Sequence, residues 1–271
     1  MQRIDRRWKF PRVRGRTVVD GDPRAYFQRL GPIKLFRRAF LEAHDLRFPE
    51  GLVRLEDGIL LSRGYLLAKR VSVLRDYGYY FRRRRDAEDN ISLRRIQPAG
   101  YLSSVRLIAD NVRDLCEDAQ LADDIILDLY QRKALRCLRT ESFLTFPPAR
   151  RRAWVQHAAR LADQHIPREL QQRLTTVPRL QSEFVRRGDV AALIAIAEAV
   201  QANRRLLVVT SRQGIHLEVD GKADRDVTDL VTLPDKALVV RGSRALRTDT
   251  HAVAISLVRS VLARTRRRVR R

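Results

Sequence analysis

The spacing of apolar residues along the first part of the chain alternates between two periods. Apolar positions three and four residues apart predict helices over residues 23–30, 33–44 and 56–68. The stretch RVSVLRDYGYYF that follows has alternating and aromatic-rich positions, which are typical of strands. Helix, helix and strand in this order indicate a piece of an α/β or α+β domain, assigned to residues 1–97.

The middle of the chain, residues 98–203, has helical periodicity throughout. Apolar residues recur at three- and four-residue spacing, and the prolines near 147 and 167 suit helix starts or connections. This pattern predicts a helical linker domain whose helices cover residues 100–117, 121–139, 147–165 and 190–203.

From Arg204 the pattern becomes strand-like. Two apolar runs flank residues 212–214, and Asp220-Gly221 is a strong hairpin-turn signal. The stretch LVTLPDKALVVRGS predicts two more short strands, whereas HAVAISLVRSVLA fits either a strand or a helix. We therefore predict a small β-domain with a basic tail over residues 204–271.

Charge narrows the class of partner. The 271 residues carry a formal net charge of +23, and 44% of them are hydrophobic, as in a globular protein. Such a charge attracts nucleic acid, acidic lipid or a phosphate-rich polymer alike. The excess is almost entirely arginine, which GC-rich coding would also produce, so the charge alone identifies no partner.

Several classes of protein are not indicated. No apolar run approaches the roughly 18 residues of a membrane span, and the N-terminus lacks the apolar core of a signal peptide. Cys116 and Cys137 lie in helical patterns, where we expect two core thiols rather than a disulfide. These features favour the cytoplasm.

Most common motifs of chemistry are missing from the sequence. The five histidines have no metal-ligand spacing, and there is no phosphate-binding glycine loop or serine nucleophile elbow. No recognition helix, zinc finger or aromatic RNA-binding motif is present either, so specific nucleic-acid binding is not predicted. In TVVDGDP, Asp20 and Asp22 could hold a divalent cation, but turn chemistry accounts for them better.

The acidic pair Glu56-Asp57, just ahead of an apolar helical run, allows two interpretations. In the first turn of a helix, each charge would stabilise the helix dipole by roughly 0.3–1 kcal/mol. Beside a cleft, the same carboxylate could accept a proton from an attacking hydroxyl. The arginines at 82–85 could then grip phosphate oxygens.

The order of these short motifs carries a resemblance to a known family. The stretch from IKLFRRAF through RLEDGILL, AKRVSV and YGYYFRRRR to DNIS resembles the C-terminal half of a family 2 glycosyltransferase catalytic domain of the GT-A type. It is most similar to the enzymes that glycosylate poly(ribitol phosphate) wall teichoic acid, in which a helical linker domain follows. The resemblance spans about residues 15–200.

The resemblance implies an inverting hexosyltransferase reaction. Asp57, with Glu56 beside it, would be the general base, while Arg85 and Ser92 would contact the donor diphosphate. Asn90 falls where relatives vary. It further implies a nucleotide-sugar donor, a polyanionic cell-wall acceptor, and Mg²⁺ or Mn²⁺ held by the complete domain, with no residue here assignable to the metal.

The chain also departs from the family pattern. The metal-binding Asp-x-Asp of the family lies far upstream of the Glu-Asp pair, whereas here only 34 residues separate Asp22 from Glu56. We therefore expect a truncated transferase without its nucleotide-binding half. The alternative is a non-catalytic module that forms a homo-oligomer and binds polyanions, or makes peripheral contact with the inner face of an anionic membrane.

Overall fold

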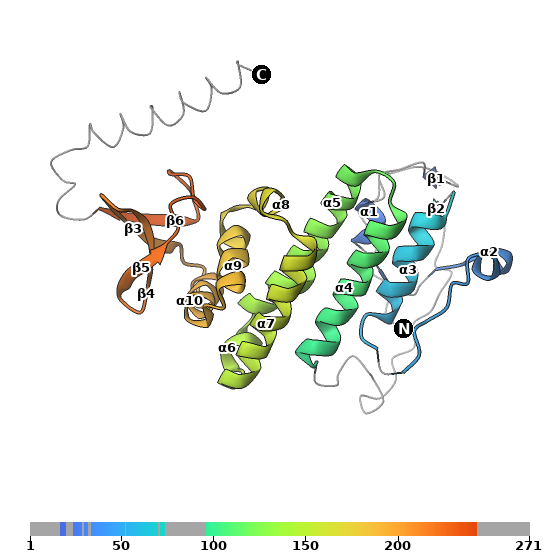
Figure 1. Cartoon of the computed structure of the whole chain (residues 1–271), viewed down its shortest axis with the longest axis horizontal. Helices are drawn as coiled ribbons and strands as arrows, with labels where there is room; N and C mark the ends of the chain where they lie inside the picture. The colour runs from blue at the N-terminus through green and yellow to red at the C-terminus, as the bar shows by residue number, and fades with distance from the viewer. Residues whose placement is uncertain are drawn as a thin grey trace, which may run out of the picture.

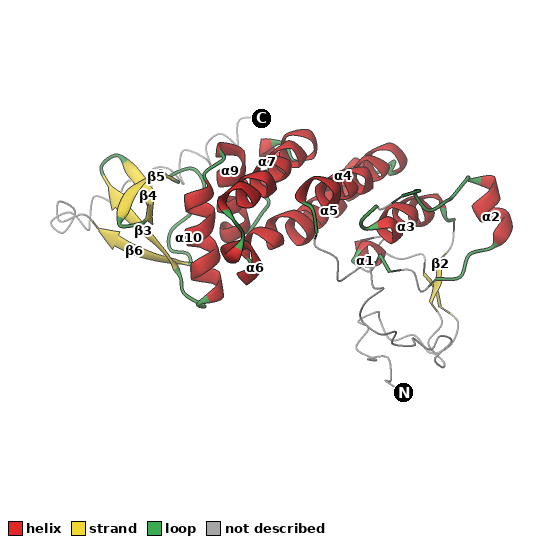
Figure 2. Ribbon diagram, turned by 90° about the horizontal axis from the view of Figure 1, so that it is seen from below, coloured by secondary structure: helices red, strands yellow, loops and turns green. Residues whose placement is uncertain are grey.

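The computed structural model describes residues 17–19, 24–28, 30–31, 34–51, 53–69, 71–73 and 96–242. These residues form an elongated arrangement (Figures 1 and 2), in which a central group of helices separates a small sheet at one end from α2 and α3 at the other. The predicted fold class, a mixed helical and β chain with a helical linker and a small sheet, is confirmed.

The N-terminal elements are short. They are β1 (Thr17–Val19), α1 (Arg24–Phe27), α2 (Arg38–Ala43), α3 (Glu56–Leu67) and β2 (Val71–Val73). The two strands pair antiparallel, with Thr17 opposite Val73. Helix α3 matches the predicted span within a residue.

The predicted helix over residues 33–44 is wrong in its extent and in its packing. Only Arg38–Ala43 is helical, and none of its residues is buried. Leu35, expected on the packed face, is 77% exposed. The apolar spacing is present, but within the described residues no element covers this face closely enough to bury it.

The linker is built from helices as predicted. In chain order they are α4 (Pro98–Leu115), α5 (Ala119–Leu129), η3 (Tyr130–Ala134), η4 (Leu135–Arg139), α6 (Glu141–Thr145), α7 (Pro148–His165), α8 (Arg168–Gln172), α9 (Thr176–Arg187) and α10 (Val190–Gln201). The predicted helix over 121–139 is continuous, but it changes from α to π and then to 3-10 geometry.

Local chemistry fixes the ends of these helices. Pro98 and Pro148 occupy the first helical turn, where a missing N–H costs nothing. The Asp118 carboxylate accepts hydrogen bonds from the N–H groups of Gln120 and Leu121 at the start of α5. Gly188 ends α9 with φ of 66°, a conformation that glycine adopts without strain.

The linker holds the main core of the described residues. Phe143, Leu135 and Phe184 have no exposed surface, and α4, α5, α7, α9 and α10 all contribute buried side chains. Cys116 and Cys137 are free thiols, half-buried against this core rather than inside it. They were expected in the core, so that prediction holds only in part.

A polar network is buried within the apolar linker. The Glu183 carboxylate, 6% exposed, accepts hydrogen bonds from Gln171 Nε2 at 3.1 Å, from Arg187 Nε at 2.9 Å and from Arg168. Burial alone would raise the pKa of Glu183, but these three donors lower it below its ordinary value. The network is therefore satisfied and ties α8 to α9.

The C-terminal sheet has four strands in the order β5-β4-β3-β6: β3 (Leu206–Ser211), β4 (Gly214–Val219), β5 (Lys222–Asp226) and β6 (Leu238–Gly242). The two hairpin turns fall at the predicted positions. The segment 230–243 was predicted to hold two strands but contributes one, β6, which pairs parallel with β3. The predicted elements beyond Gly242 lie outside the described residues.

Candidate functional site

The acidic pair lies in the first turn of α3. Leu55 precedes it in the left-handed conformation, with φ of 56°, and its side chain offers no cap to the helix. Glu56 and Asp57 are half-buried, and among the described residues neither carboxylate makes a hydrogen bond or an ion pair. Within this part of the chain the pair therefore makes no capping hydrogen bond.

The electrostatics of Asp57 suit a proton acceptor. Partial burial raises the pKa of Asp57, and the neighbouring Glu56 charge raises it further. A carboxylate with a raised pKa is a stronger base once it is ionised. The raised pKa is compatible with the role of general base, which stays a prediction.

Helix α3 is held against α4 by close approach. A Cβ added at Gly58 would lie 2.7 Å from Ile108 Cδ1, so glycine lets the two helices meet there. Asn111 Nδ2 of α4 donates to Ile59 O at 3.2 Å and to Ser62 Oγ at 2.9 Å. These contacts fix the beginning of α3, and with it the acidic pair, relative to the linker.

A recess of about 50 Å³ lies beside the start of α3. Four elements line it: α1 with its following turn, the start of α3, α4 and η3. Leu55 and Gly58, which flank the acidic pair in sequence, share this recess with Arg132 and Lys133 of the linker. The structure thus brings linker cations next to the helix that carries the candidate base.

The two cations are held differently. Arg132 donates to the Asp128 carboxylate at 2.7 Å and to Phe27 O at 3.0 Å, which anchors α1 to the linker. For Lys133, burial lowers the pKa of the ammonium and the Arg132 charge lowers it further. The sequence analysis did not select this pair, although the basic run QRKALRCLR within a helical pattern was a visible signal.

The donor-side candidates are not tested by the structure. Arg85, Asn90 and Ser92 lie outside the described residues, as do Asp20 and Asp22. Within the described ranges, no group of three or more His, Cys, Asp or Glu side chains could hold a metal ion. Nor is any helix there long and apolar enough to cross a membrane.

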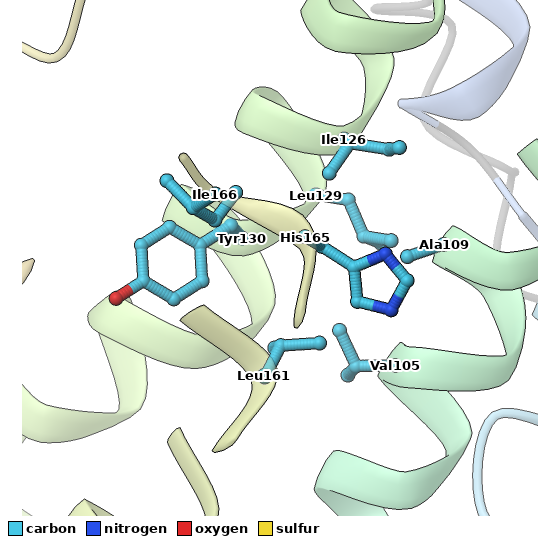
Figure 3. Close-up of a pocket in the computed structure, with 8 residues that line it drawn as sticks. All are labelled: Val105, Ala109, Ile126, Leu129, Tyr130, Leu161, His165 and Ile166. Atoms are coloured by element: carbon cyan, nitrogen blue, oxygen red, sulfur yellow. The ribbon is translucent and has the colours of Figure 1, made fainter. Parts of the chain in front are cut away.

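A void in the linker lies between α4, α5 and α7 (Figure 3), away from the acidic pair. Its lining is apolar apart from His165 and Tyr130, whose hydroxyl points away from the imidazole in Figure 3. His165 Nε2 is 3.2 Å from Asp110 Oδ1, close enough for attraction but not aligned as a hydrogen bond. Because the void has no room for a water molecule, it is a packing feature and not a ligand site.

Comparison with known proteins identifies the middle of the chain. Residues 98–197 match the family model of the glycosyl transferase TarS linker domain. The predicted helical linker of a wall teichoic acid glycosyltransferase-like protein is therefore confirmed.

Relatives of known function match part of the chain. The chain is 33% identical over 103 residues to the poly(ribitol-phosphate) β-N-acetylglucosaminyltransferase TarS of Staphylococcus aureus strain Mu50, covering 38% of this chain and 18% of the relative. It is 32% identical over 84 residues to a poly(ribitol-phosphate) β-glucosyltransferase of Bacillus spizizenii, covering 31% of this chain and 13% of that enzyme. The alignments thus span less than a fifth of each relative.

Solved structures share the fold over a longer stretch. A structure of residues 1–349 of Staphylococcus aureus TarS in complex with UDP-GlcNAc superposes with a TM-score of 0.60 at 22% identity, covering 73% of this chain and 56% of that one. A longer TarS structure gives a TM-score of 0.56 at 20% identity, and the superposition covers 73% of this chain and 33% of that one. The likeness therefore extends beyond the linker.

Proposed function

We propose that this chain takes part in the transfer of a sugar from a nucleotide-sugar donor to a polyanionic cell-wall polymer such as teichoic acid. The observation that carries the proposal is the TarS linker domain packed directly against the helix of the Glu56-Asp57 pair. The half-buried Asp57 with a raised pKa supports the role of general base.

In the proposed reaction, Asp57 removes the proton from an acceptor hydroxyl. The oxygen then forms a bond to the anomeric carbon of the donor sugar, on the face opposite the diphosphate. The bond from that carbon to the diphosphate oxygen breaks. The nucleotide diphosphate leaves and the anomeric configuration is inverted. Glu56 keeps the charge around Asp57 negative, which strengthens the base.

The donor side of the proposal rests on the sequence resemblance. Arg85 and Ser92 would contact the donor diphosphate, with Asn90 close by, and Mg²⁺ or Mn²⁺ would neutralise part of its charge. The net charge of +23 would draw the phosphate polymer to the protein and favour the inner face of an anionic membrane. Homo-oligomerisation belongs to the same proposal.

The test is transfer of GlcNAc from UDP-GlcNAc to poly(ribitol phosphate), measured with Mg²⁺ or Mn²⁺ present. The full chain is assayed alone and together with a polypeptide that carries the nucleotide-binding half of TarS. Asp57→Asn should lower kcat about 10²- to 10⁴-fold with little change in the KM for the donor, since only proton transfer is affected.

Asp45→Asn is the matched control. It makes the same chemical change on an exposed carboxylate beside Arg47, in a left-handed conformation that asparagine tolerates. Equal rates for wild type and Asp57→Asn would remove Asp57 from the role of base. The absence of both donor binding and transfer under all of these conditions would overturn the proposed function.

A second candidate function is a non-catalytic module that forms oligomers and holds polyanions. It is favoured by one observation: the family match begins at residue 98, outside the acidic pair. An oligomer by light scattering, combined with no binding of UDP-GlcNAc, would support this module over the transferase.

A further inference from the structure

A row of linker cations begins at the recess beside the acidic pair. Lys133 lines that recess, Arg136 is exposed, and Arg139 is half-buried at the end of η4. We call Lys133, Arg136 and Arg139 the linker strip. Among the described residues, none of the three forms an ion pair or a side-chain hydrogen bond.

The 3-10 geometry of η4 aligns the side chains of Arg136 and Arg139. In an α-helix, residues three apart differ by about 300° and so drift by about 60° at each step. In a 3-10 helix, residues i and i+3 eclipse one another, so Arg136 and Arg139 of η4 lie along one edge. Lys133 lies in the preceding π-turn, and the fully buried Leu135 and Leu138 form a neighbouring edge of η4 that faces the core.

The like charges of the strip repel one another. The charge of Arg136 lowers the pKa of Arg139, after burial, and it contributes to the lowered pKa of Lys133 as well. Elsewhere in the linker, Arg113 is matched with Asp123 at 2.7 Å, and Arg186 with Asp163. Partly buried cations without an acidic partner, as Lys133 and Arg139 are among the described residues, cost stability, so an external anion is the natural partner.

We propose that the linker strip binds successive phosphates of a phosphodiester-linked polyol polymer and leads it to the start of α3. The strip reaches the start of α3 at the recess that Lys133 shares with Leu55 and Gly58. Arg136 and Arg139 are about 6 Å apart along the 3-10 axis, so a flexible chain of phosphates can engage both of them. This inference rests on the proposed function and assigns binding of the acceptor polymer to the linker.

The test measures binding of a fluorescent synthetic hexamer of ribitol phosphate to the full chain, by polarisation at 150 mM salt. Lys133→Gln/Arg136→Gln/Arg139→Gln should weaken binding about tenfold or more. The slope of log K against log salt should become shallower by about two, because fewer counterions are released. Arg136→Gln alone, at an exposed position that folding does not depend on, should weaken binding about threefold.

The matched control is Arg204→Gln/Arg205→Gln/Arg212→Gln. These exposed arginines flank β3, which lies at the opposite end of the molecule from α3 (Figure 1). Their loss lowers the net charge by the same three units, from +23 to +20. Less than a twofold change is expected. Equal weakening by both triple variants would show that only bulk charge attracts the polymer, and would overturn the strip.

A single-stranded oligonucleotide with the same number of phosphates serves as the second probe. If the strip triple variant lost as much affinity for the oligonucleotide as for the hexamer, the assignment to a polyol polymer would be overturned. UDP-GlcNAc binding by the strip triple variant separates the two proposals. Donor binding without strip-dependent polymer binding contradicts only the strip, whereas strip-dependent polymer binding without donor binding or transfer contradicts only the transferase.

Discussion

Helices α3 and α9 both have twelve residues, and they are held in opposite ways. Helix α9 buries Pro178 and every residue from Leu180 to Val185. Helix α3 buries mainly small or aliphatic positions, Gly58, Leu60, Leu61, Ser62 and Gly64. The first is surrounded by neighbours, whereas the second meets α4 through a close contact at glycine.

The difference suits the roles of the two helices. Helix α9 combines large apolar side chains with a satisfied network around Glu183, so it is part of what keeps the linker folded. Helix α3 leaves its first turn half-exposed, with two carboxylates that have no partner among the described residues. Elements that meet ligands are commonly those with fewer buried contacts, because access and dense packing exclude each other.

The largest expected effect is on α9. Phe184 is fully buried, so Phe184→Ala should lower the free energy of unfolding by about 3–5 kcal/mol through lost burial and a cavity. Urea unfolding followed by circular dichroism measures this. Leu107→Ala, at a position 41% exposed, is the control and should cost less than about 0.5 kcal/mol. A loss near 1 kcal/mol for Phe184→Ala would mean that α9 is not an anchor.

A smaller and more local effect is expected on α3. Asn111→Ala removes the two hydrogen bonds from α4 to Ile59 and Ser62, and should cost about 1–2 kcal/mol. Hydrogen exchange should then accelerate in α3 but not in α9. Gln120→Ala, which removes a surface hydrogen bond to Asp124, should change neither helix. Equal acceleration in both helices would show that α3 opens only when the whole chain unfolds.

The sequence predicted the regular part of the linker well. Apolar spacing, with prolines and caps at the ends, is local information, and it placed α4, α5, α7 and α10 within a few residues. Helix α9 was not singled out, because its buried face includes Gln181, Ser182 and Glu183. Polar residues enter a core only when partners distant in sequence satisfy them, and apolar spacing does not reveal those partners.

The opposite failure occurs around α2. Leu35 follows an apolar pattern but is 77% exposed, since a pattern predicts a face and not what covers it.

The candidate site was also predicted only in part. The acidic pair and its helix followed from sequence, but Lys133 reaches the same recess through the packing of η3 beside α1 and α3. That proximity is a tertiary property. The change from α to 3-10 geometry that aligns Arg136 with Arg139 has no sequence signature of its own.

The smallest expected effect on stability comes from Glu56→Gln, which tests why the pKa of Asp57 is raised. Burial and the Glu56 charge both raise its pKa, with burial the larger cause. Glu56→Gln removes only the neighbouring charge, so ionisation of Asp57 becomes easier and its pKa falls, though burial keeps it above the ordinary value. The free energy of unfolding should change by less than about 0.5 kcal/mol.

The measurement is a ¹³C NMR titration of the Asp57 carboxyl in wild type and Glu56→Gln, with exposed Glu50→Gln as control. The midpoint should move to lower pH in Glu56→Gln alone. Where transfer is detectable, the acid limb of its pH profile should move in the same direction, because the base must be ionised to act. An unmoved midpoint would assign the raised pKa to burial alone, and Glu56 would then have no part in tuning the base.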